Sequence, residues 1–320
     1  MIDRIIKAYL SELRDYGNQP QEYKTSGIWT GAEKKFIFGK EIENDKLPEL
    51  LKEFAKNELG KGISIIDGER HIENEIALWK EAYNLPLQVL SYPDKFGFNL
   101  YEFENIKTIG NATRISACAK IISDLTKGNV LEIGGGFGGI PFHLFRDFNF
   151  NRTYFNFDIP YVGLISKYFL TQMFPDKKFL FYGEDDIKNF ANYDFVLMPH
   201  YMIKELPDNC CELVCNFNSL AEMGNSQIKE YLKQIDRLST KYFFHVNHRF
   251  QAWFKNTDPK KLDIDENHIA DLDKSEYRLP TERWRLLSKN LSNFSNFGDN
   301  INYWEYIFKQ NDYRNNKGTF

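Results

Sequence analysis

The sequence predicts an α/β protein with a doubly wound, mainly parallel β-sheet. Three observations support this prediction. From about residue 108 onward, short apolar segments alternate with helical segments, a pattern typical of parallel βαβ units. A glycine-rich turn joins one of these strands to a helix at residues 134–139. The first hundred or so residues lack this alternation and carry the apolar spacing of amphipathic helices, so a mainly helical region is expected to precede the sheet.

The N-terminal helical region is expected to span residues 1–105. One helix is predicted around Ile5 and Tyr9, a second over Lys46–Leu59 and a third over Ile72–Tyr83, because apolar residues fall on one face of each segment. Residues 27–38 and 86–99 are less regular. We expect this region to bind substrate or to mediate assembly into a homo-oligomer.

Residues 106–320 are expected to form the sheet domain. Helices are predicted by apolar periodicity over 112–125, 141–147, 164–174 and 227–238. Strands are predicted where short runs of aromatic and β-branched residues occur, over 129–133, 152–157, 178–182, 193–198, 212–217, 242–246 and 303–309.

Composition excludes several classes of protein. The 41 Lys and Arg against 45 Asp and Glu give a net charge of −4, which argues against a nucleic-acid-binding protein. No apolar run approaches the roughly 20 residues that span a bilayer, and the N-terminus lacks the apolar stretch of a signal peptide. The four cysteines form no CxxC pair. We therefore expect a reduced, cytoplasmic protein without a structural metal site.

The glycine-rich turn predicts a site for a nucleoside cofactor. Five of the six residues 134–139 are glycines, which lets a ligand approach backbone atoms and the following helix N-terminus. Asp158 ends the next predicted strand, where an acid can accept the hydroxyls of a ribose. Glu132 lies two residues before the first glycine. A carboxylate there would repel the pyrophosphate of a dinucleotide, but it suits the ammonium group of S-adenosylmethionine (SAM).

The segment from Val130 to Gly138 resembles motif I of the class I SAM-dependent methyltransferases. That resemblance implies a Rossmann-like sheet of seven strands with an antiparallel last strand. It also implies that Glu132, Gly134, Gly136 and Gly138 bind the methionine part of SAM and that Asp158 binds its ribose.

The resemblance to the methyltransferase family implies further cofactor contacts. In that family the adenine site usually follows the third strand, and two segments of this sequence compete for that place. Either Glu184 or Asp185 accepts the adenine amino group, or His200 lies near the base. Arg114, on the helix before the first strand, could reach the cofactor carboxylate, and Asn218 follows the predicted fourth strand.

A narrower resemblance combines the glycine turn with residues 218–223 (NSLAEM). Together these segments are similar to sugar O-methyltransferases of bacterial surface-polysaccharide and antibiotic gene sets. This resemblance implies methyl transfer to a sugar hydroxyl, in polysaccharide or glycosylated-metabolite biosynthesis. The acceptor would be a sugar, a nucleotide sugar or a glycan.

Four residues are candidates for the general base that removes the hydroxyl proton. His200, His245 and His248 lie at the ends of predicted strands, where open α/β sheets bind ligands, and histidine titrates near neutral pH. Glu222 follows the fourth strand. Ser219, Arg249 and Trp253 are candidate acceptor-binding residues, because they lie just beyond strand ends. No pair of acids stands at the fourth strand end, so no metal is expected.

Two other functions compete with this interpretation. One is methyl transfer to a different small molecule or to a phosphorylated precursor. The other is an NAD-dependent epimerase or dehydrogenase with a Tyr-x-x-x-Lys pair. The pair with that spacing, Tyr313 and Lys317, lies in the polar tail beyond the last predicted strand. A protein that keeps the cofactor fold without turnover is a third possibility.

Overall fold

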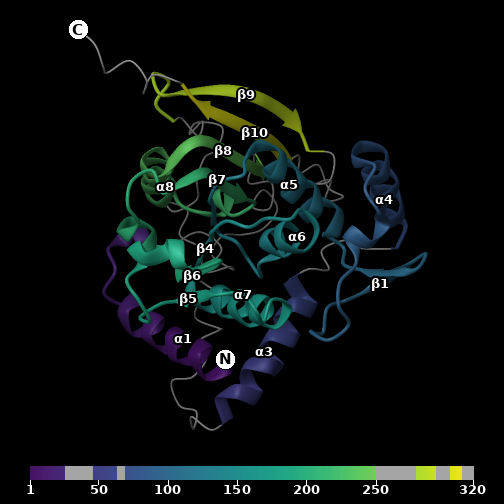
Figure 1. The fold of residues 1–320 in the computed structure, drawn as a ribbon, viewed down its shortest axis with the longest axis horizontal. Coiled ribbons are helices and arrows are strands. Elements are labelled where there is room, and N and C mark those ends of the chain that lie inside the picture. The colour runs from purple at the N-terminus through teal and green to yellow at the C-terminus, as the bar shows by residue number, and fades with distance from the viewer. Residues whose placement is uncertain (26–45, 63–68, 249–278, 293–302, 312–320) are drawn as a thin grey trace, which may run out of the picture.

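One mixed β-sheet organises the chain (Figure 1). The computed structural model describes residues 1–25, 46–62, 69–248, 279–292 and 303–311. In these ranges eight strands form the sheet, in the order β5-β6-β4-β3-β7-β8-β10-β9. The strands are β3 (Val130–Ile133), β4 (Tyr154–Asp158), β5 (Phe179–Phe181), β6 (Phe195–Pro199), β7 (Cys211–Phe217), β8 (Ser239–His248), β9 (Trp284–Leu291) and β10 (Tyr303–Gln310).

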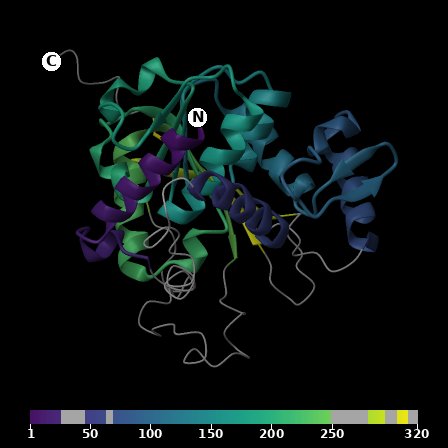
Figure 2. The same cartoon turned by 90° about the horizontal axis from the view of Figure 1, so that it is seen from below.

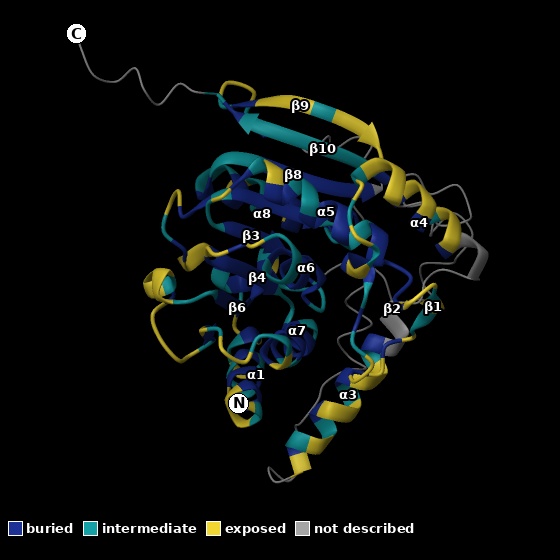
Figure 3. Cartoon of the chain, turned by 45° about the vertical axis from the view of Figure 1, so that its right-hand side comes forward, coloured by how far each residue is buried: buried dark blue, intermediate teal, exposed yellow. Residues whose placement is uncertain are grey.

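The direction of the strands confirms the predicted Rossmann-like sheet. Neighbouring strands from β5 to β8 are parallel, and β10 is antiparallel to both β8 and β9. The described sheet has eight strands rather than seven. The sequence did not predict β9, because most of its residues are exposed (Figure 3) and it lacks an alternating buried face.

Helices cover both faces of the sheet. Val130, Tyr154 and Phe244 point to the face covered by α5, α6 and α7, whereas their neighbours Leu131 and Phe155 point to the face covered by α8, as strand geometry requires. The helices are α5 (Ala112–Leu125), α6 (Gly139–Asp147), α7 (Pro160–Met173) and α8 (Asn225–Leu238), with 3-10 turns η4 (Ile187–Asn192), η5 (His200–Glu205) and η6 (Leu220–Glu222).

The predicted helices of the sheet domain are present with small changes at their ends. α5 has the predicted bounds. α7 starts four residues before the expected 164, at Pro160, because the fixed φ of proline suits the first turn of a helix.

The chain before α5 contributes three described helices and a hairpin. These are α1 (Ile2–Tyr16), α3 (Leu47–Gly62), α4 (Glu69–Tyr83) and the pair β1 (Tyr101–Phe103) and β2 (Ile106–Thr108), with 3-10 turns η1 (Gln21–Tyr23) and η3 (Leu87–Leu90). The hairpin was not predicted. α4 and the hairpin project to one side of the sheet (Figure 2). The irregular segment expected at 27–38 lies outside the described residues.

α1 packs directly on α7 (Figure 1). Lys167 Nζ lies 2.8 Å from a carboxylate oxygen of Glu12, and both side chains are fully buried. The described part of the N-terminal region therefore shares its core with the sheet. No helix in the described ranges is long and apolar enough to cross a membrane.

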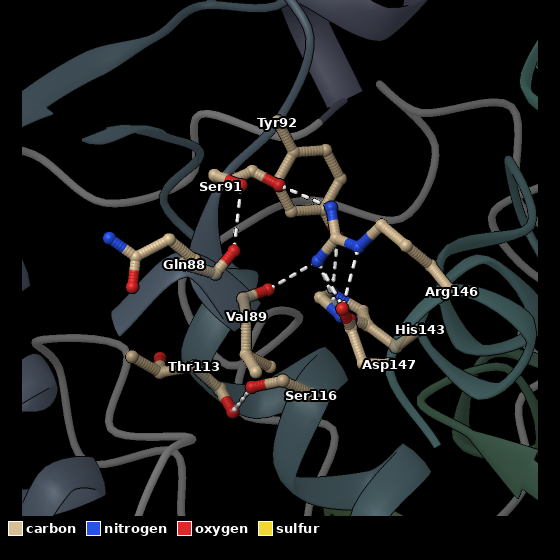
Figure 4. A network of polar contacts seen from close by, with 9 residues as sticks. All are labelled: Gln88, Val89, Ser91, Tyr92, Thr113, Ser116, His143, Arg146 and Asp147. Atoms are coloured by element: carbon tan, nitrogen blue, oxygen red, sulfur yellow. Dashed lines mark hydrogen bonds and ion pairs between the residues drawn. The ribbon is translucent and has the colours of Figure 1, made fainter. Parts of the chain in front are cut away.

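A polar network centred on Arg146 holds the η3 segment against α6 (Figure 4). The guanidinium donates to the carbonyls of Val89 and Ser91 and to both oxygens of Asp147. His143 Nδ1 donates to Asp147 at 2.8 Å, and its Nε2 accepts from the Tyr92 hydroxyl at 2.9 Å. Both ring nitrogens of this buried histidine are therefore bonded.

Candidate cofactor-binding site

The glycine turn runs from the end of β3 to the start of α6. Gly134, Gly136 and Gly138 have φ values of +70°, +58° and +91°, which glycine adopts without the steric cost that a side chain would impose. A Cβ added to Gly136 would meet no atom within 4 Å. The turn therefore combines a tight backbone path with open space beside its middle residue.

A cavity of about 130 Å³ lies beside this turn. Its apolar wall comes from α5, α6 and strand ends, and its polar residues are Glu132, Arg114 and Asn218. Pockets for drug-sized ligands have volumes of roughly 300–1,000 Å³, so this cavity is too small to enclose a whole nucleoside cofactor.

Glu132 places a carboxyl group in this cavity. The residue is 2% exposed, and one of its oxygens accepts a hydrogen bond of 2.7 Å from the Tyr154 hydroxyl. Burial raises the pKa of Glu132 to about 8, although the Tyr154 hydrogen bond opposes this shift. A cation that enters the cavity would restore the ionised carboxylate, because an opposite charge nearby favours the charged form.

Asp158 ends β4 on the other side of the turn. One carboxylate oxygen accepts from the Gly136 N–H at 2.7 Å, and the other accepts from the Ile159 N–H at 2.7 Å. Burial raises the pKa of Asp158 to about 7, and these two backbone bonds limit the rise. Each oxygen keeps a lone pair, so the carboxylate can also accept from ligand hydroxyls.

Arg114 and Asn218 meet at the far side of the cavity. With the Asn218 amide oxygen turned toward the guanidinium, Arg114 donates to it from Nη1 at 2.8 Å and from Nη2 at 3.2 Å. Asn218 has a φ of +65°, a left-handed conformation that asparagine adopts more readily than most residues. The lining of the cavity therefore includes both a carboxyl group and a guanidinium.

The strand order bears on the two candidate adenine segments. β6 lies between β4 and β5, so His200, just after β6, follows the strand that pairs with the one carrying Asp158. Glu184 instead pairs with Arg4 of α1 at 2.8 Å. Asp185 accepts from the Asn189 amide and the Tyr193 hydroxyl within its own turn.

His200 is buried beneath the N-terminal segment. Its Nε2 donates to the Tyr23 carbonyl at 2.8 Å, and its ring contacts that of Tyr16 edge to face. Burial lowers the pKa of His200 to about 4. The ring is therefore neutral near pH 7.

The other candidate bases occupy different places. His245 lies on the α8 face of β8, stacked between Phe243 and Tyr306, whereas its neighbour Val246 lines the cavity on the opposite face. Burial lowers the pKa of His245 to about 3. The structure thus separates His245 from the cavity. Glu222 ends η6 and is partly buried.

Three remaining candidates have little or no described environment. His248 ends β8, where its backbone pairs with Tyr303, but its side chain lies outside the described set. Arg249 and Trp253 lie outside the described residues altogether. Ser219 does lie at the turn: its hydroxyl is 3.3 Å from the Ile133 carbonyl oxygen, and it would collide with a Cβ on Gly134.

Sequence reasoning missed several residues of the site. Phe137, Ile115, Cys118, Ile140 and Phe217 form the apolar wall of the cavity. They looked like ordinary core residues, because nothing in their spacing distinguishes a cavity wall from a core. Tyr154 donates to Glu132 from the neighbouring strand, but its register position is opposite Val130, so no signal in the sequence indicates this contact. In the described part of the chain, no group of three or more His, Cys, Asp or Glu is arranged to hold a metal ion.

Comparison with solved structures returns methyltransferases. A SAM-dependent methyltransferase from Leishmania major is 13% identical, with coverage of 61% of this chain and 71% of that one and a TM-score of 0.40. Magnesium protoporphyrin IX methyltransferase from Synechocystis, with bound S-adenosylhomocysteine (SAH), is 7% identical, with coverage of 82% and 100% and a TM-score of 0.43. No protein-family model and no curated protein matches the sequence. At these low TM-scores the fold assignment rests on the strand order of this chain.

Proposed function

We propose that this chain is a SAM-dependent O-methyltransferase. The observation that carries the proposal is the buried Glu132 carboxyl beside a glycine turn with open space at Gly136. A buried carboxyl group is costly unless a partner compensates it. The ammonium group of SAM is such a partner, whereas the pyrophosphate of NAD is repelled by the ionised carboxylate.

The chain's own residues have distinct roles in this proposal. Glu132 accepts the cofactor ammonium, and Arg114, held by Asn218, donates to the cofactor carboxylate. Asp158 accepts the ribose hydroxyls, and the segment at His200 lies near the base. Gly134, Gly136 and Gly138 keep side chains out of the cofactor's path. When bound, SAM supplies a methyl group activated by its sulfonium.

We propose a sugar hydroxyl as the acceptor, in a nucleotide sugar or a glycan assembled in the cytoplasm. Support comes from the likeness of residues 218–223 to sugar O-methyltransferases, and these residues follow β7, beside the glycine turn. Glu222 and His248 are the proposed candidates for the base. Ser219, Arg249 and Trp253 are the proposed acceptor-binding residues. Such residues must align the acceptor oxygen with the methyl group and remove its proton.

Isothermal titration with SAM, SAH and NAD tests the cofactor assignment. We expect binding of SAM and SAH and none of NAD. Binding of NAD in preference to SAH would contradict the proposal. Transfer of a radiolabelled methyl group to a panel of nucleotide sugars and to phosphorylated and unphosphorylated small molecules then tests the acceptor, because a label found only on a non-sugar compound removes the sugar assignment.

A further inference from the structure

Two buried asparagines join the glycine turn to the loop after β7. Asn216 lies near the end of β7 and Asn247 near the end of β8, with exposures of 0% and 1%. A buried amide group is costly unless its donors and acceptors are bonded. The contacts of these two side chains therefore show what they hold together.

Both polar atoms of the Asn216 side-chain amide form hydrogen bonds. Its Nδ2 donates to the Ile133 carbonyl at 2.7 Å and also to the Ser219 hydroxyl. Its Oδ1 accepts from the Leu220 N–H at 3.2 Å and from Asn247 Nδ2 at 2.9 Å. Ile133 directly precedes Gly134, so this side chain connects the start of the glycine turn to the loop.

Asn247 completes the connection from the neighbouring strand. Its Oδ1 accepts from the Ala221 N–H at 3.1 Å, and its Nδ2 lies 3.3 Å from His245 Nδ1 as well as bonding Asn216. The backbone N–H groups of Leu220 and Ala221 are therefore each held by a buried amide oxygen. We call Asn216 and Asn247 the amide pair.

The amide pair fixes the part of the loop that reaches the cavity. Asn218 lies between these anchors: its N–H donates to the Val246 carbonyl at 2.8 Å, and its side chain meets Arg114 in the cavity. The loop also packs against the turn so closely that a Cβ on Gly134 would lie 2.1 Å from the Ser219 hydroxyl oxygen. A shift of the loop would move Asn218 and Arg114 relative to Glu132.

We propose that Asn216 and Asn247 are positioning residues of the cofactor site, which set the placement of Arg114 and Asn218 relative to Glu132. This inference rests on the proposed function, since the ligand that contacts both charged groups is the amino-acid part of SAM or SAH. Neither asparagine lines the cavity, so each acts through the loop and the turn.

Asn247→Asp tests the proposal through its pH dependence. A protonated aspartic acid has the shape of asparagine, and its O–H can donate to Asn216 while its carbonyl accepts from Ala221. The ionised form has no donor and repels the Asn216 oxygen. At pH 6 we expect SAH to bind Asn247→Asp nearly as tightly as it binds wild type. At pH 9 we expect Asn247→Asp to bind SAH about tenfold more weakly than wild type does at the same pH, since hydrogen bonds are lost there.

Asn247→Leu provides the matched comparison, because leucine has a similar volume and cannot donate at any pH. We expect its SAH affinity to be about tenfold below that of wild type at both pH values. Asp236→Asn serves as a stability control. Asp236 accepts from Arg283 and Trp284, near the opposite end of β8 from Asn247, so its replacement should lower the melting temperature without changing SAH affinity.

The outcomes separate the two proposals. If wild type does not bind SAH, the proposed function fails. If wild type binds SAH and both Asn247 variants match the wild-type affinity at pH 6 and at pH 9, the positioning role is overturned. It is also overturned if Asp236→Asn loses as much affinity as Asn247→Leu for a similar change in melting temperature. Should Asn247→Leu not fold, the pH dependence of Asn247→Asp relative to wild type decides alone.

Discussion

The two ends of α6 show how similar residue types serve different purposes. At the C-terminal end, His143, Asp147 and Arg146 bond to one another and to the η3 segment (Figure 4). At the N-terminal end, the glycine turn borders a cavity where Glu132 accepts a hydrogen bond from Tyr154 and from no other residue in the described ranges. Closed networks stabilise a fold, whereas a desolvated carboxyl group beside open space is typical of a ligand site.

The pKa values of the carboxyl groups at the two ends of α6 are shifted in opposite directions. Burial favours the neutral form of Asp147, but hydrogen bonds from His143 and Arg146 outweigh it and lower the pKa of that carboxyl. Burial dominates at Glu132 and raises its pKa to about 8. The difference indicates that the protein supplies the counter-charge at one end and leaves it to a ligand at the other.

Glu132→Gln should have the largest effect on binding. We expect SAH affinity to fall about 100-fold, because a buried charge pair with the ligand ammonium is lost. Titration calorimetry measures this, with Glu75→Gln as the matched control. Glu75 accepts from Thr113 on α5 and does not line the cavity, so that variant should bind like wild type. Equal affinity of Glu132→Gln and wild type would contradict the assignment of Glu132.

His143→Leu should have the opposite profile. It removes the hydrogen bonds to Asp147 and Tyr92 and leaves a buried tyrosine hydroxyl without its partner, which should cost about 2–3 kcal/mol in the free energy of unfolding. Chemical denaturation measures the loss. SAH affinity measured well below the melting temperature should change little. A large loss of affinity at unchanged stability would show that the two ends of α6 are not functionally distinct.

SAH affinity should depend strongly on pH. The ionised carboxylate binds the ammonium, and the pKa of Glu132 without a ligand is about 8. Affinity should therefore increase about 50-fold from pH 6 to pH 8, as the proton that opposes binding is lost. Calorimetry in buffers of different ionisation enthalpy should show proton release at pH 7. The increase should be smaller in Glu132→Gln, where Asp158 alone titrates.

The stability of the empty protein should respond in the opposite direction. A pKa of about 8 in the folded state lies above the usual value of 4.5. The stability that the protonated carboxyl contributes is present in acid and is lost as pH rises from about 4.5 to 8. Glu132→Gln should therefore melt at a higher temperature than wild type at pH 9 and at a similar temperature at pH 5. A wild type that is the more stable protein at pH 9 would contradict this expectation.

His245→Gln should have the smallest effect. The ring lies on the α8 face of the sheet, away from the cavity, so SAH affinity and methyl transfer to an acceptor found in the panel should stay within about threefold of wild type. Glu222→Gln, assayed beside it, should lose far more turnover. If His245→Gln alone abolished turnover, the separation of the two faces would not describe the active enzyme.

The sequence was sufficient to predict the sheet and the glycine turn. Alternation of strands and helices and the placement of Glu132 and Asp158 are local properties, which spacing along the chain reveals. The order of β5 and β6 was not local: both segments were predicted as strands, but only pairing decides which one lies beside β4. β9 was missed because its exposed face carries no hydrophobic alternation.

The surroundings of the candidate histidines also could not be predicted. The bond from His200 to the Tyr23 carbonyl joins residues far apart in the sequence, and no pattern in either segment indicates it. His143 was expected on a helix and His245 on a strand, but the partners of their rings come from segments far away in the sequence. Asn216 and Asn247 could be predicted only as polar residues near strand ends, because the pairing of their two strands is not a local property of the sequence.

The buried contact between Glu12 and Lys167 has a practical consequence for anyone who divides this chain. A fragment that starts at residue 106 would lack the carboxylate that pairs with Lys167 and would expose the apolar surface on which Ile5 and Tyr9 pack. Such a fragment should aggregate during expression. Truncations meant to isolate the catalytic unit should keep the first sixteen residues and shorten the protein elsewhere.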